Sequence, residues 1–405
     1  MVRSQAARQR ERLAEELEAA EERASESARK LADVRADLER IRRRRIVRIG
    51  RLVEGLARRL RSSVARGRGP AGKRPPVRVT EKVPDETSAR PRSAAPAVAI
   101  HIGARTWAAA EKWGDTAFAR SLQHEFELHG WSASVHVAEE SDAGPAVAAD
   151  VALHLFGSRV PAVRPGQLSL LWLISHPDRV TRRLCAPYDA IFVASESLRD
   201  LLAQTASAPV VTLLQATDPG RFHPEPTGPK HELLFVGNSR GVRRPILDAL
   251  AGTDRDLAVY GSGWTSRLLD MRRLRGEWIP NDQLNRYYSS ADIVLSDHWR
   301  DMREEGFISN RVFDALASGA FVISDQVAGI DRAFDGAVVT WQADEDVNAL
   351  VTRYLDRPDE RRERAEQGRA AVLARHTFAH RVDTILETLA TLSPARFEIP
   401  AGQGE

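Results

Sequence analysis

The sequence predicts an α/β protein with two Rossmann-like, doubly wound domains that face a cleft. Continuous apolar, β-branched runs alternate with helical stretches along most of the chain, which is typical of parallel strands covered on both faces. The alternation stops once, in the proline-rich segment TDPGRFHPEPTGPKH (217–231), and then restarts. The 405 residues, 42% of them hydrophobic, suffice for two cores behind an N-terminal extension.

Residues 1–65 are predicted to be helical. Residues 10–41 carry a heptad seam, which indicates either a coiled coil that forms a homodimer or docks a partner, or a lone solvated helix. The seam positions are Leu13, Leu17, Ala20, Ala24, Ser27, Leu31, Val34, Leu38 and Ile41.

A second amphipathic pattern, over residues 42–65, is strongly basic. Residues 42–78 hold 14 Lys or Arg and one acid. This pattern suits an anionic membrane surface, or else a solvated basic face that continues the coil. Nucleic acid is not an expected partner, because no aromatic side chains are interleaved here to stack on bases. Residues 66–96 are rich in Pro, Gly, Ser and charge and predict a disordered linker.

The single cysteine, Cys185, excludes a disulfide framework and a cysteine-rich zinc site. The first residues have no apolar core, so no secretory signal is expected. No apolar run approaches the ~18 residues that span a bilayer. We therefore expect a cytoplasmic protein, with peripheral association at the inner face of the cell membrane if the basic helix binds lipid.

The first domain is predicted over 97–228 and the second over 229–405. The expected strands of the first are 97–102, 132–138, 150–156, 168–175, 188–195 and 209–214. Those of the second are 232–237, 256–261, 292–297, 320–325 and 337–341, followed by helices at 344–355, 358–374 and 378–392. Two such halves place a ligand cleft between the carboxyl ends of both sheets.

The stretch FVGNSRGVRRPILDAL (235–250) has the pattern of strand, tight turn and helix. Amides and side chains of Asn238, Ser239 and Arg240 are expected near a helix N-terminus, where anions bind. Arg243 and Arg244 add charge suited to bidentate phosphate contacts. The alternative is a simple βα turn with surface arginines.

The stretch EEGFISNRVFDALASGAFVISD (304–325) predicts a second phosphate seat. A helix is expected to begin at Asn310, so that amides of residues 307–311 point into the cleft. Arg311 adds a fixed charge there. Asp314 lies one turn further in, where a carboxylate can accept hydrogen bonds from a ribose diol.

These stretches, in order with VYGSGW (259–264) and RGEWIPNDQLNRYYSSADIVLSDHW (275–299), resemble the C-terminal half of a GT-B glycosyltransferase. The resemblance is nearest to the CgeB-like bacterial enzymes and the wider family 4. IHIGARTWAAAEKWGDTAFARSLQHEFELHGW (100–131) and LWLISHPDRVT with YDAIFVASESL (171–198) are similar to the N-terminal domain of that family. The likeness covers about residues 97–392.

The resemblance implies a nucleotide-sugar donor in the second domain and a glycan or lipid-linked acceptor at the first. The phosphate-clamping pair of the family falls on Arg243 and Arg244, and the ribose ligand on Asp314. The other expected donor contacts are Gly103, Asn238, Ser239, Arg240, Gly261, Gly263, Trp278, Ile279, Gly306, Phe307, Ile308, Ser309, Asn310 and Arg311. Trp278 is expected beside the base, or else in a core.

The family separates its two acids by seven residues, whereas Glu305 leaves eight and Glu304 nine before Asp314. Glu304 and Glu305 are the candidates for the acid that faces the donor sugar. Ser309, Asn310 and Arg311 are the alternative contacts.

In the first domain, His176 follows a predicted strand, where an imidazole can act as base or orient the sugar. The alternative is a structural histidine that caps a loop. Trp113, Gly114 and Asp115 open the next helix and are expected on the acceptor side. His101 and His154 lie in strand-like runs and are expected to be packing residues.

No group of carboxylates or histidines has convincing metal spacing, and the resemblance implies metal-independent transfer. The predicted function is transfer of a sugar from a nucleotide sugar to a cell-envelope polysaccharide or related glycan. The alternative is a non-catalytic nucleotide-sugar or glycan-binding scaffold. A Rossmann oxidoreductase is disfavoured, because neither half opens with a complete G-x-G-x-x-G and an acid about 20 residues on.

Overall fold

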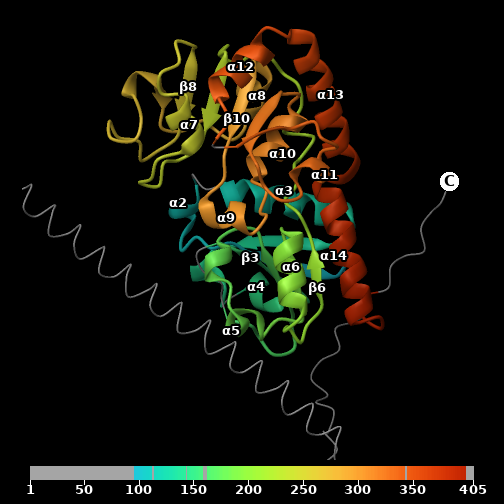
Figure 1. Ribbon diagram of the computed structural model, residues 1–405. Coiled ribbons are helices and arrows are strands. Elements are labelled where there is room, and N and C mark those ends of the chain that lie inside the picture. Colours follow the sequence, from blue (N-terminus) through green and yellow to red (C-terminus); the bar gives the residue numbers. More distant parts are fainter. Residues whose placement is uncertain (1–94, 112–113, 143, 158–161, 343, 398–405) are drawn as a thin grey trace, which may run out of the picture. The chain divides into compact units, whose positions relative to one another are not determined.

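The computed structural model describes residues 95–111, 114–142, 144–157, 162–342 and 344–397 (Figure 1). The predicted coiled coil (10–41), the basic helix (42–65), most of the linker (66–96) and Trp113 lie outside these residues, and their predictions stay predictions. Within the described ranges, no helix combines the length and apolarity that a membrane span needs.

The N-terminal domain is built on a parallel sheet with the strand order β2-β1-β3-β4-β5-β6. This confirms the six predicted strands, and in the register Ile100 lies between Val135 and Leu153. The order reverses beside β1, and ligands bind in the crevice at the carboxyl ends of such a sheet. The strands are β1 (Ala97–His101), β2 (Ser132–His136), β3 (Val151–Phe156), β4 (Leu168–Leu173), β5 (Ala190–Val193) and β6 (Val210–Thr212).

Helices cover both faces of this sheet, as the unbroken apolar strands require. α3 (Gly114–Leu128) packs on one face through Phe118, Leu122 and Phe126. α5 (Arg182–Cys185) and α6 (Glu196–Ala203) contribute Cys185 and Leu198 to the core on the other face. The shorter elements are α2 (Trp107–Ala110), η1 (Ala138–Glu140), α4 (Pro145–Ala148) and η2 (Pro177–Arg179).

The C-terminal domain has a second parallel sheet, with the order β12-β11-β10-β7-β8-β9. All five predicted strands are present: β7 (Leu233–Val236), β8 (Leu257–Tyr260), β10 (Ile293–Ser296), β11 (Val322–Asp325) and β12 (Val339–Trp341). The sixth, β9 (Leu274–Gly276), was not predicted. Its three residues, LRG, carry too little apolar pattern to distinguish an edge strand from a loop.

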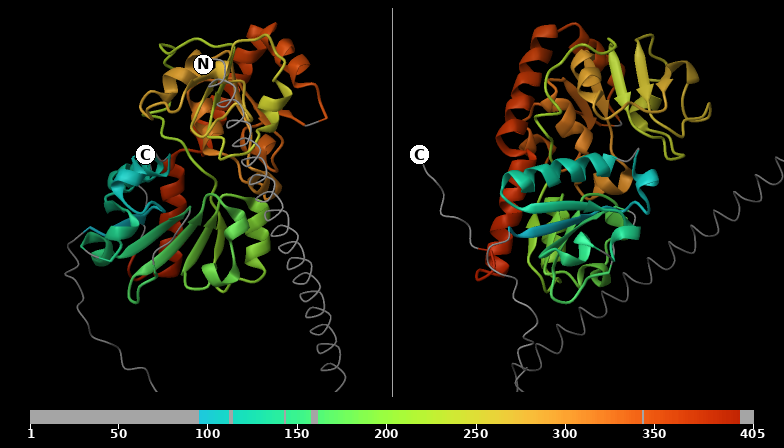
Figure 2. Two further views of the ribbon diagram at one scale, coloured as in Figure 1. Left: turned by 90° about the vertical axis from the view of Figure 1, so that its left-hand side faces the viewer. Right: turned by 180° about the vertical axis from the view of Figure 1, so that it is seen from behind.

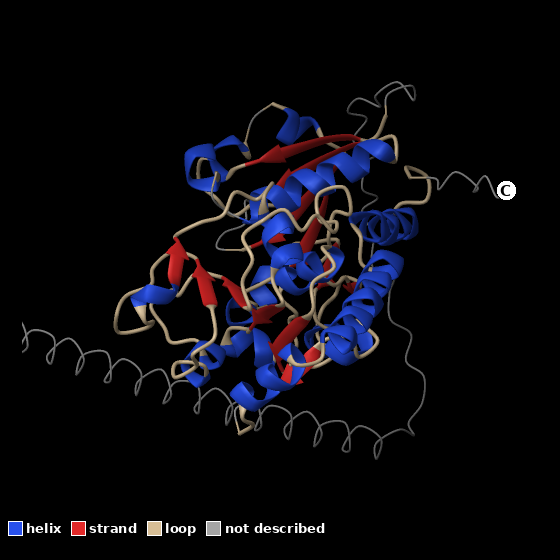
Figure 3. Ribbon diagram, turned by 90° about the horizontal axis from the view of Figure 1, so that it is seen from above, coloured by secondary structure: helices blue, strands red, loops and turns tan. Residues whose placement is uncertain are grey.

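Helices also flank the second sheet on both faces (Figure 3). One face packs on α8 (Leu284–Ser290), α10 (Asn310–Ala317) and α11 (Ile330–Ala333), and the other on α7 (Pro245–Ala249) and α12 (Val347–Leu355). α13 (Pro358–Arg375) reaches both clusters through Ala365 and Val372. The remaining elements are η3 (Met271–Arg273) and α9 (Arg300–Glu304).

The last helix, α14 (Phe378–Leu392), lies against the N-terminal domain (Figure 2). Phe378, Val382, Ile385 and Leu389 join the core that α3 covers. The predicted second domain, 229–405, contained this helix, but the structure packs it on the first domain. The chain therefore crosses between the domains twice, once before β7 and once before α14.

Candidate functional site

A cavity of about 260 Å³ opens at the carboxyl ends of β7 and β8. Gly237 and Gly261 directly follow these strands, and Glu111 and Gly114 reach the cavity from the N-terminal domain. Its remaining lining is Val236, Asn238, Arg240, Arg244, Tyr260, Glu277, Trp278, Ile279, Asn281, Leu284, Trp299 and Arg311. Three arginines and three aromatic residues, Tyr260, Trp278 and Trp299, give this cavity the composition of a nucleotide site.

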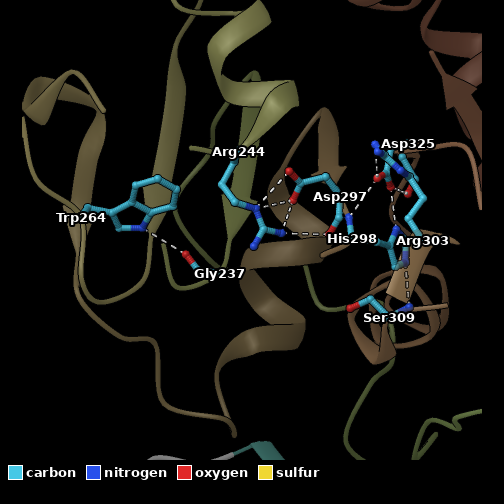
Figure 4. A network of polar contacts seen from close by, with 9 residues as sticks. Gly237, Arg244, Trp264, Asp297, His298, Arg303, Ser309 and Asp325 are labelled. Carbon is cyan, nitrogen blue, oxygen red and sulfur yellow. Dashed lines mark hydrogen bonds and ion pairs between the residues drawn. The ribbon is translucent and has the colours of Figure 1, made fainter. Parts of the chain in front are cut away.

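Glycine is required where the two strand ends meet. A Cβ on Gly261, whose φ is +150°, would overlap the backbone carbonyl of Gly237. Trp264 Nε1 donates to the same Gly237 oxygen at 3.1 Å (Figure 4). Gly263, whose φ is +75°, lies beside Ser239. The predicted glycines therefore allow close backbone approach between the loops that follow β7 and β8.

Asn238 and Ser239 hold these two loops together. Asn238 Oδ1 accepts from the Ser262 amide at 2.8 Å, and Ser239 Oγ donates to the Gly263 carbonyl. The predicted order of strand, tight turn and helix is present: Arg240 and Gly241 take up positive φ angles of 48° and 75° in the turn, and α7 begins at Pro245. Asn238 and Ser239 lie in this turn, seven and six residues ahead of α7, so their amides are not those of its first turn.

Arg244 is buried and forms an ion pair with Asp297. Its Nε donates to both carboxylate oxygens of Asp297, at 2.8 and 3.0 Å, and its Nη2 donates to the Asp297 carbonyl at 3.0 Å (Figure 4). The guanidinium also lies 4.3 Å from the ring centre of Trp299. Arg243, in contrast, is exposed, pairs with Asp248 at 3.0 Å and lies outside the cavity lining. Of the predicted phosphate clamp, only Arg244 lines the cavity, where it is paired with Asp297, whereas Arg243 is exposed outside it.

Arg311 is the unusual charge of the site. It reaches the cavity from the first turn of α10, and among the described residues it makes no ion pair. Its Nη1 is buried without a hydrogen-bond partner. Burial, and then the neighbouring Arg244, lower the pKa of Arg311. The side chain as a whole is half-buried, and the carboxylate of Asp297 acts on its charge. A buried N–H group without a partner is costly, however, so this position favours an anion.

Arg240 completes the basic end of the cavity. Its guanidinium lies 4.9 Å from the ring centre of Trp299. Burial and Arg244 lower the pKa of Arg240, while Asp115 across the domain boundary acts in the opposite direction. Burial raises the pKa of Asp115, which stands in the first turn of α3. Asp115 of the N-terminal domain and Arg240 of the C-terminal domain therefore interact electrostatically at the basic end of the cavity.

Trp278 and Ile279, which were predicted to contact the base, both line the cavity. Trp278 is 49% exposed, whereas Ile279 is buried in the core of the domain. Tyr260 joins them at the end of β8, and its position before Gly261 was the sequence signal that could have identified it.

The stretch 304–314 is only partly placed as predicted. The helix does begin at Asn310, but of this stretch only Arg311 lines the cavity. Ile308 packs in the core of its own domain and Phe307 in the core of the other, directly after Gly306, which has a φ of +75°. The Ser309 amide, predicted to be available for phosphate, donates to His298 Nε2 at 2.8 Å.

Both carboxylate oxygens of Asp314 accept hydrogen bonds from side chains of the protein. Its Oδ1 accepts from Thr217 Oγ1 and its Oδ2 from Asn310 Nδ2, both at 2.8 Å. Burial raises the pKa of Asp314 to about 7, although these hydrogen bonds oppose the shift. The predicted ribose ligand therefore ties α10 to the segment that links the domains and lies outside the cavity lining.

The three residues predicted to be catalytic also lie outside the lining. Glu304 ends α9, is exposed and accepts from Arg300 Nε at 2.7 Å. Glu305 contributes its carbonyl to contacts with the N-terminal domain. His176 is half-buried with a φ of +54°, and burial followed by the charge of Arg179 lowers its pKa. Gly103 is buried in the loop after β1, outside the lining.

A metal-binding group was not expected from the sequence, but the described residues contain one combination that could hold an ion. His176, Asp178 and Asp301 bring ligand atoms within 4.8 Å of one another. The cations of Arg179 and Arg240 act on the same histidine and compete with a metal for this place.

Residues that sequence reasoning did not assign form the support of the site. His298 Nδ1 donates to Asp325 Oδ1 at 2.6 Å, and the His298 amide donates to Asp325 Oδ2 at 3.1 Å. His298 belongs, with Asp297 and Trp299, to the DHW triplet that follows β10, and Asp325 is the last residue of β11. Polar residues directly after a buried strand were the only signal for them.

Comparisons with known proteins agree with this architecture. Residues 241–387 match a family described as "Glycosyl transferase-like". No curated protein sequence matches the chain.

Several solved structures share the fold. A sucrose-phosphate synthase from Thermosynechococcus elongatus is similar with a TM-score of 0.54 at 14% identity, over 74% of this chain and 100% of the other. An alpha-glucosyltransferase solved with UDP and a 13-mer DNA has a TM-score of 0.54 at 9% identity, over 73% and 100%. Anabaena HepE, solved with UDP-glucose, has a TM-score of 0.51 at 11% identity, over 73% and 99%. The protein therefore has the GT-B fold and carries a glycosyl transferase-like domain within its C-terminal half.

Proposed function

We propose that the protein transfers a sugar from a nucleotide-diphosphate donor to a cell-envelope glycan or a lipid-linked acceptor. The observation that carries the donor assignment is Arg311, a half-buried arginine at the wall of the cavity whose buried Nη1 has no hydrogen-bond partner. A diphosphate would supply the missing partner through charge-assisted hydrogen bonds.

The composition of the cavity suggests how such a donor lies. The base would take the end formed by Trp278, Tyr260 and Ile279, and the diphosphate the end formed by Arg311 and Arg240. The alpha-glucosyltransferase and HepE were solved with UDP and UDP-glucose, which supports a nucleotide sugar here. The acceptor would approach from the side of Gly114 and Asp115.

We propose that arginines offset the charge of the leaving diphosphate in place of a divalent ion. Arg244 is held rigid by Asp297, and its charge is largely compensated. Arg240 and Arg311 therefore supply most of the positive field. His176 is the proposed residue on the acceptor side that contacts the sugar or accepts a proton.

Binding and turnover of UDP-, GDP-, dTDP- and CMP-sugars would test the proposal. Calorimetry should detect one of the four donors, and Arg311→Gln should weaken that donor roughly 10- to 150-fold, the range of one hydrogen bond to a charged group. Arg272→Gln is the matched control, because Arg272 is exposed and pairs with Asp270 outside the cavity. Absence of binding to all four donors would refute the proposal.

A second candidate is a non-catalytic scaffold that binds a nucleotide sugar or glycan. The observation that favours it is that Glu304 and Glu305 both lie outside the cavity lining. Donor binding with no hydrolysis or transfer, unchanged by His176→Ala, would support the scaffold. Donor turnover that His176→Ala lowers would support the enzyme.

The N-terminal partners remain proposals from the sequence. Residues 10–41 are proposed to form a homodimer, and residues 42–65 to bind the inner face of the cell membrane. Light scattering and co-sedimentation with vesicles containing phosphatidylglycerol would compare the full chain with a chain lacking residues 1–94. Unchanged mass per particle and unchanged vesicle binding would contradict both.

A further inference from the structure

The segment that joins α9 to α10, residues 305–309, belongs to both domains. We call it the coupling loop. It lies in the C-terminal domain by sequence, yet Phe307 is fully buried in the hydrophobic core of the N-terminal domain. The same cluster includes Leu173, Tyr188 and Val193 of that domain. A side chain of one domain thus completes the core of the other.

Hydrogen bonds fix the loop to the N-terminal domain on either side of Phe307. Ser195 Oγ and Ser197 Oγ both donate to the Glu305 carbonyl, the second at 2.9 Å. Gln215 Nε2 donates to the Ile308 carbonyl at 3.3 Å. A Cβ on Gly306 would lie 2.9 Å from Ser197 Oγ, so the glycine allows this close approach as well as the positive φ.

The far end of the loop is fixed to the C-terminal domain by a hydrogen-bond chain (Figure 4). The Ser309 amide donates to His298 Nε2 at 2.8 Å, so this nitrogen carries a lone pair. Nδ1 then carries the proton and donates to Asp325 Oδ1 at 2.6 Å. All three residues of this hydrogen-bond chain belong to the C-terminal domain, and His298 and Asp325 are buried.

Arg311 follows this fixed point by two residues. Ser309 is the N-cap of α10, and Arg311 extends from its first turn into the donor cavity. Any shift of the loop along the chain displaces the guanidinium with it. The direction of Arg311 therefore depends on an anchor in each domain.

We propose that the coupling loop transmits the packing of the two domains to Arg311, with Phe307 and His298 as positioning residues for the donor diphosphate. This rests on the proposed function for the donor and goes beyond it in naming how the acceptor domain controls the donor site. Loosening the domain interface would misplace Arg311, and donor binding would in turn stabilise the interface, because such coupling is reciprocal.

Hydrogen exchange in the ligand-free full chain tests the coupling without any assumption about the donor. Phe307→Leu and Phe307→Ala should speed exchange of the amides of residues 309–312 by about 5-fold or more, the lower end of typical coupling. Leu153→Ala is the control, because Leu153 is buried on the other face of the N-terminal sheet and contributes to a separate cluster. Exchange at 309–312 that rises no more in the Phe307 variants than in Leu153→Ala would overturn the proposal.

Donor affinity provides the second readout. Calorimetry with UDP and GDP should show a Kd at least about 5-fold higher for Phe307→Leu, with no such rise for Leu153→Ala. His298→Leu should raise the Kd as well, whereas His298→Gln, which keeps an acceptor for the Ser309 amide, should restore part of the affinity. Equal affinities for wild type and Phe307→Leu would refute the coupling but leave the proposed function intact. Failure of the wild type to bind any nucleotide would refute the proposed function, and hydrogen exchange would still decide the coupling.

Discussion

Arg244 and Asp297 form an ion pair that is almost fully removed from water, with side chains 4% and 1% exposed. Removing one member of a buried pair leaves a charge without compensation, which typically costs about 3–5 kcal/mol. We therefore expect Arg244→Met to lower the free energy of unfolding by about that amount in urea denaturation. Arg243→Met is the control, because the exposed pair of Arg243 with Asp248 should contribute at most about 1 kcal/mol. Equal losses for the two variants would contradict this account.

Arg311 should behave in the opposite way. Because the Nη1 of this half-buried arginine is buried without a hydrogen-bond partner, Arg311→Met should leave the free energy of unfolding unchanged or raise it in the ligand-free protein. The same variant should lose the rise in melting temperature that a saturating donor gives to the wild type. Differential scanning calorimetry with and without donor measures both effects. A strongly destabilised apo variant would mean that Arg311 serves the fold and not a ligand.

Both sheets could be predicted from the sequence because their strands are buried on two faces and appear as unbroken apolar runs. The start of α10 at Asn310 could be predicted as well. β9 could not, because three residues at an edge carry almost no pattern. Local periodicity therefore predicted every strand of the two sheets except the edge strand β9, which has no buried residue.

The site was harder to predict because its contacts join distant segments. Arg244 and Asp297 are 53 residues apart, and Thr217 and Asp314 are 97 apart. Phe307 follows Glu305 and Gly306 in a polar turn, yet it belongs to the core of the other domain. No local pattern distinguishes an arginine that meets a carboxylate from one that meets a ligand, so Arg244 and Arg311 looked alike.

Two glycines of the donor domain should differ sharply in tolerance. Gly261→Ala places a Cβ on the Gly237 carbonyl oxygen, so the ends of β7 and β8 must separate and the cavity must change. Gly241→Ala meets no atom within 4 Å and carries only the penalty of a positive φ, about 1–2 kcal/mol. We expect urea denaturation to show a clearly larger loss for Gly261→Ala, and calorimetry to show loss of donor binding in that variant alone. Equal stability and donor affinity in the two variants would show that the close backbone contact between Gly261 and Gly237 is not required.

The N-terminal domain should lose stability in acid because of histidines that lie abreast on neighbouring strands. His101 and His154 stack with ring centres 4.8 Å apart, and neither ring nitrogen of His154 has a hydrogen-bond partner. Burial lowers the pKa of His101 to about 3 and that of His154 to about 4. His136 and Arg164 add positive charge near His101, and Glu140 lies near His136.

Since both pKa values are below the value of about 6.5 in the unfolded chain, the stabilisation is complete above pH 6.5 and is lost as the pH falls toward 4. Asp314 has the opposite effect: because its pKa is raised to about 7, the folded state binds its proton first, and this group increases the free energy of unfolding as the pH falls through 7. His154→Leu should remove one of the two histidine contributions and flatten the slope by about 1.4 kcal/mol per pH unit between pH 6.5 and 4.5.

Urea denaturation at several pH values in this range measures the slope. At pH 7.5 the variant should be at least as stable as the wild type, because a buried polar group without a partner is replaced by an apolar one. His223→Leu, at a half-exposed position in the segment that links the domains, should keep the wild-type slope. Parallel slopes for wild type and His154→Leu would mean that His154 is not held neutral in the folded state.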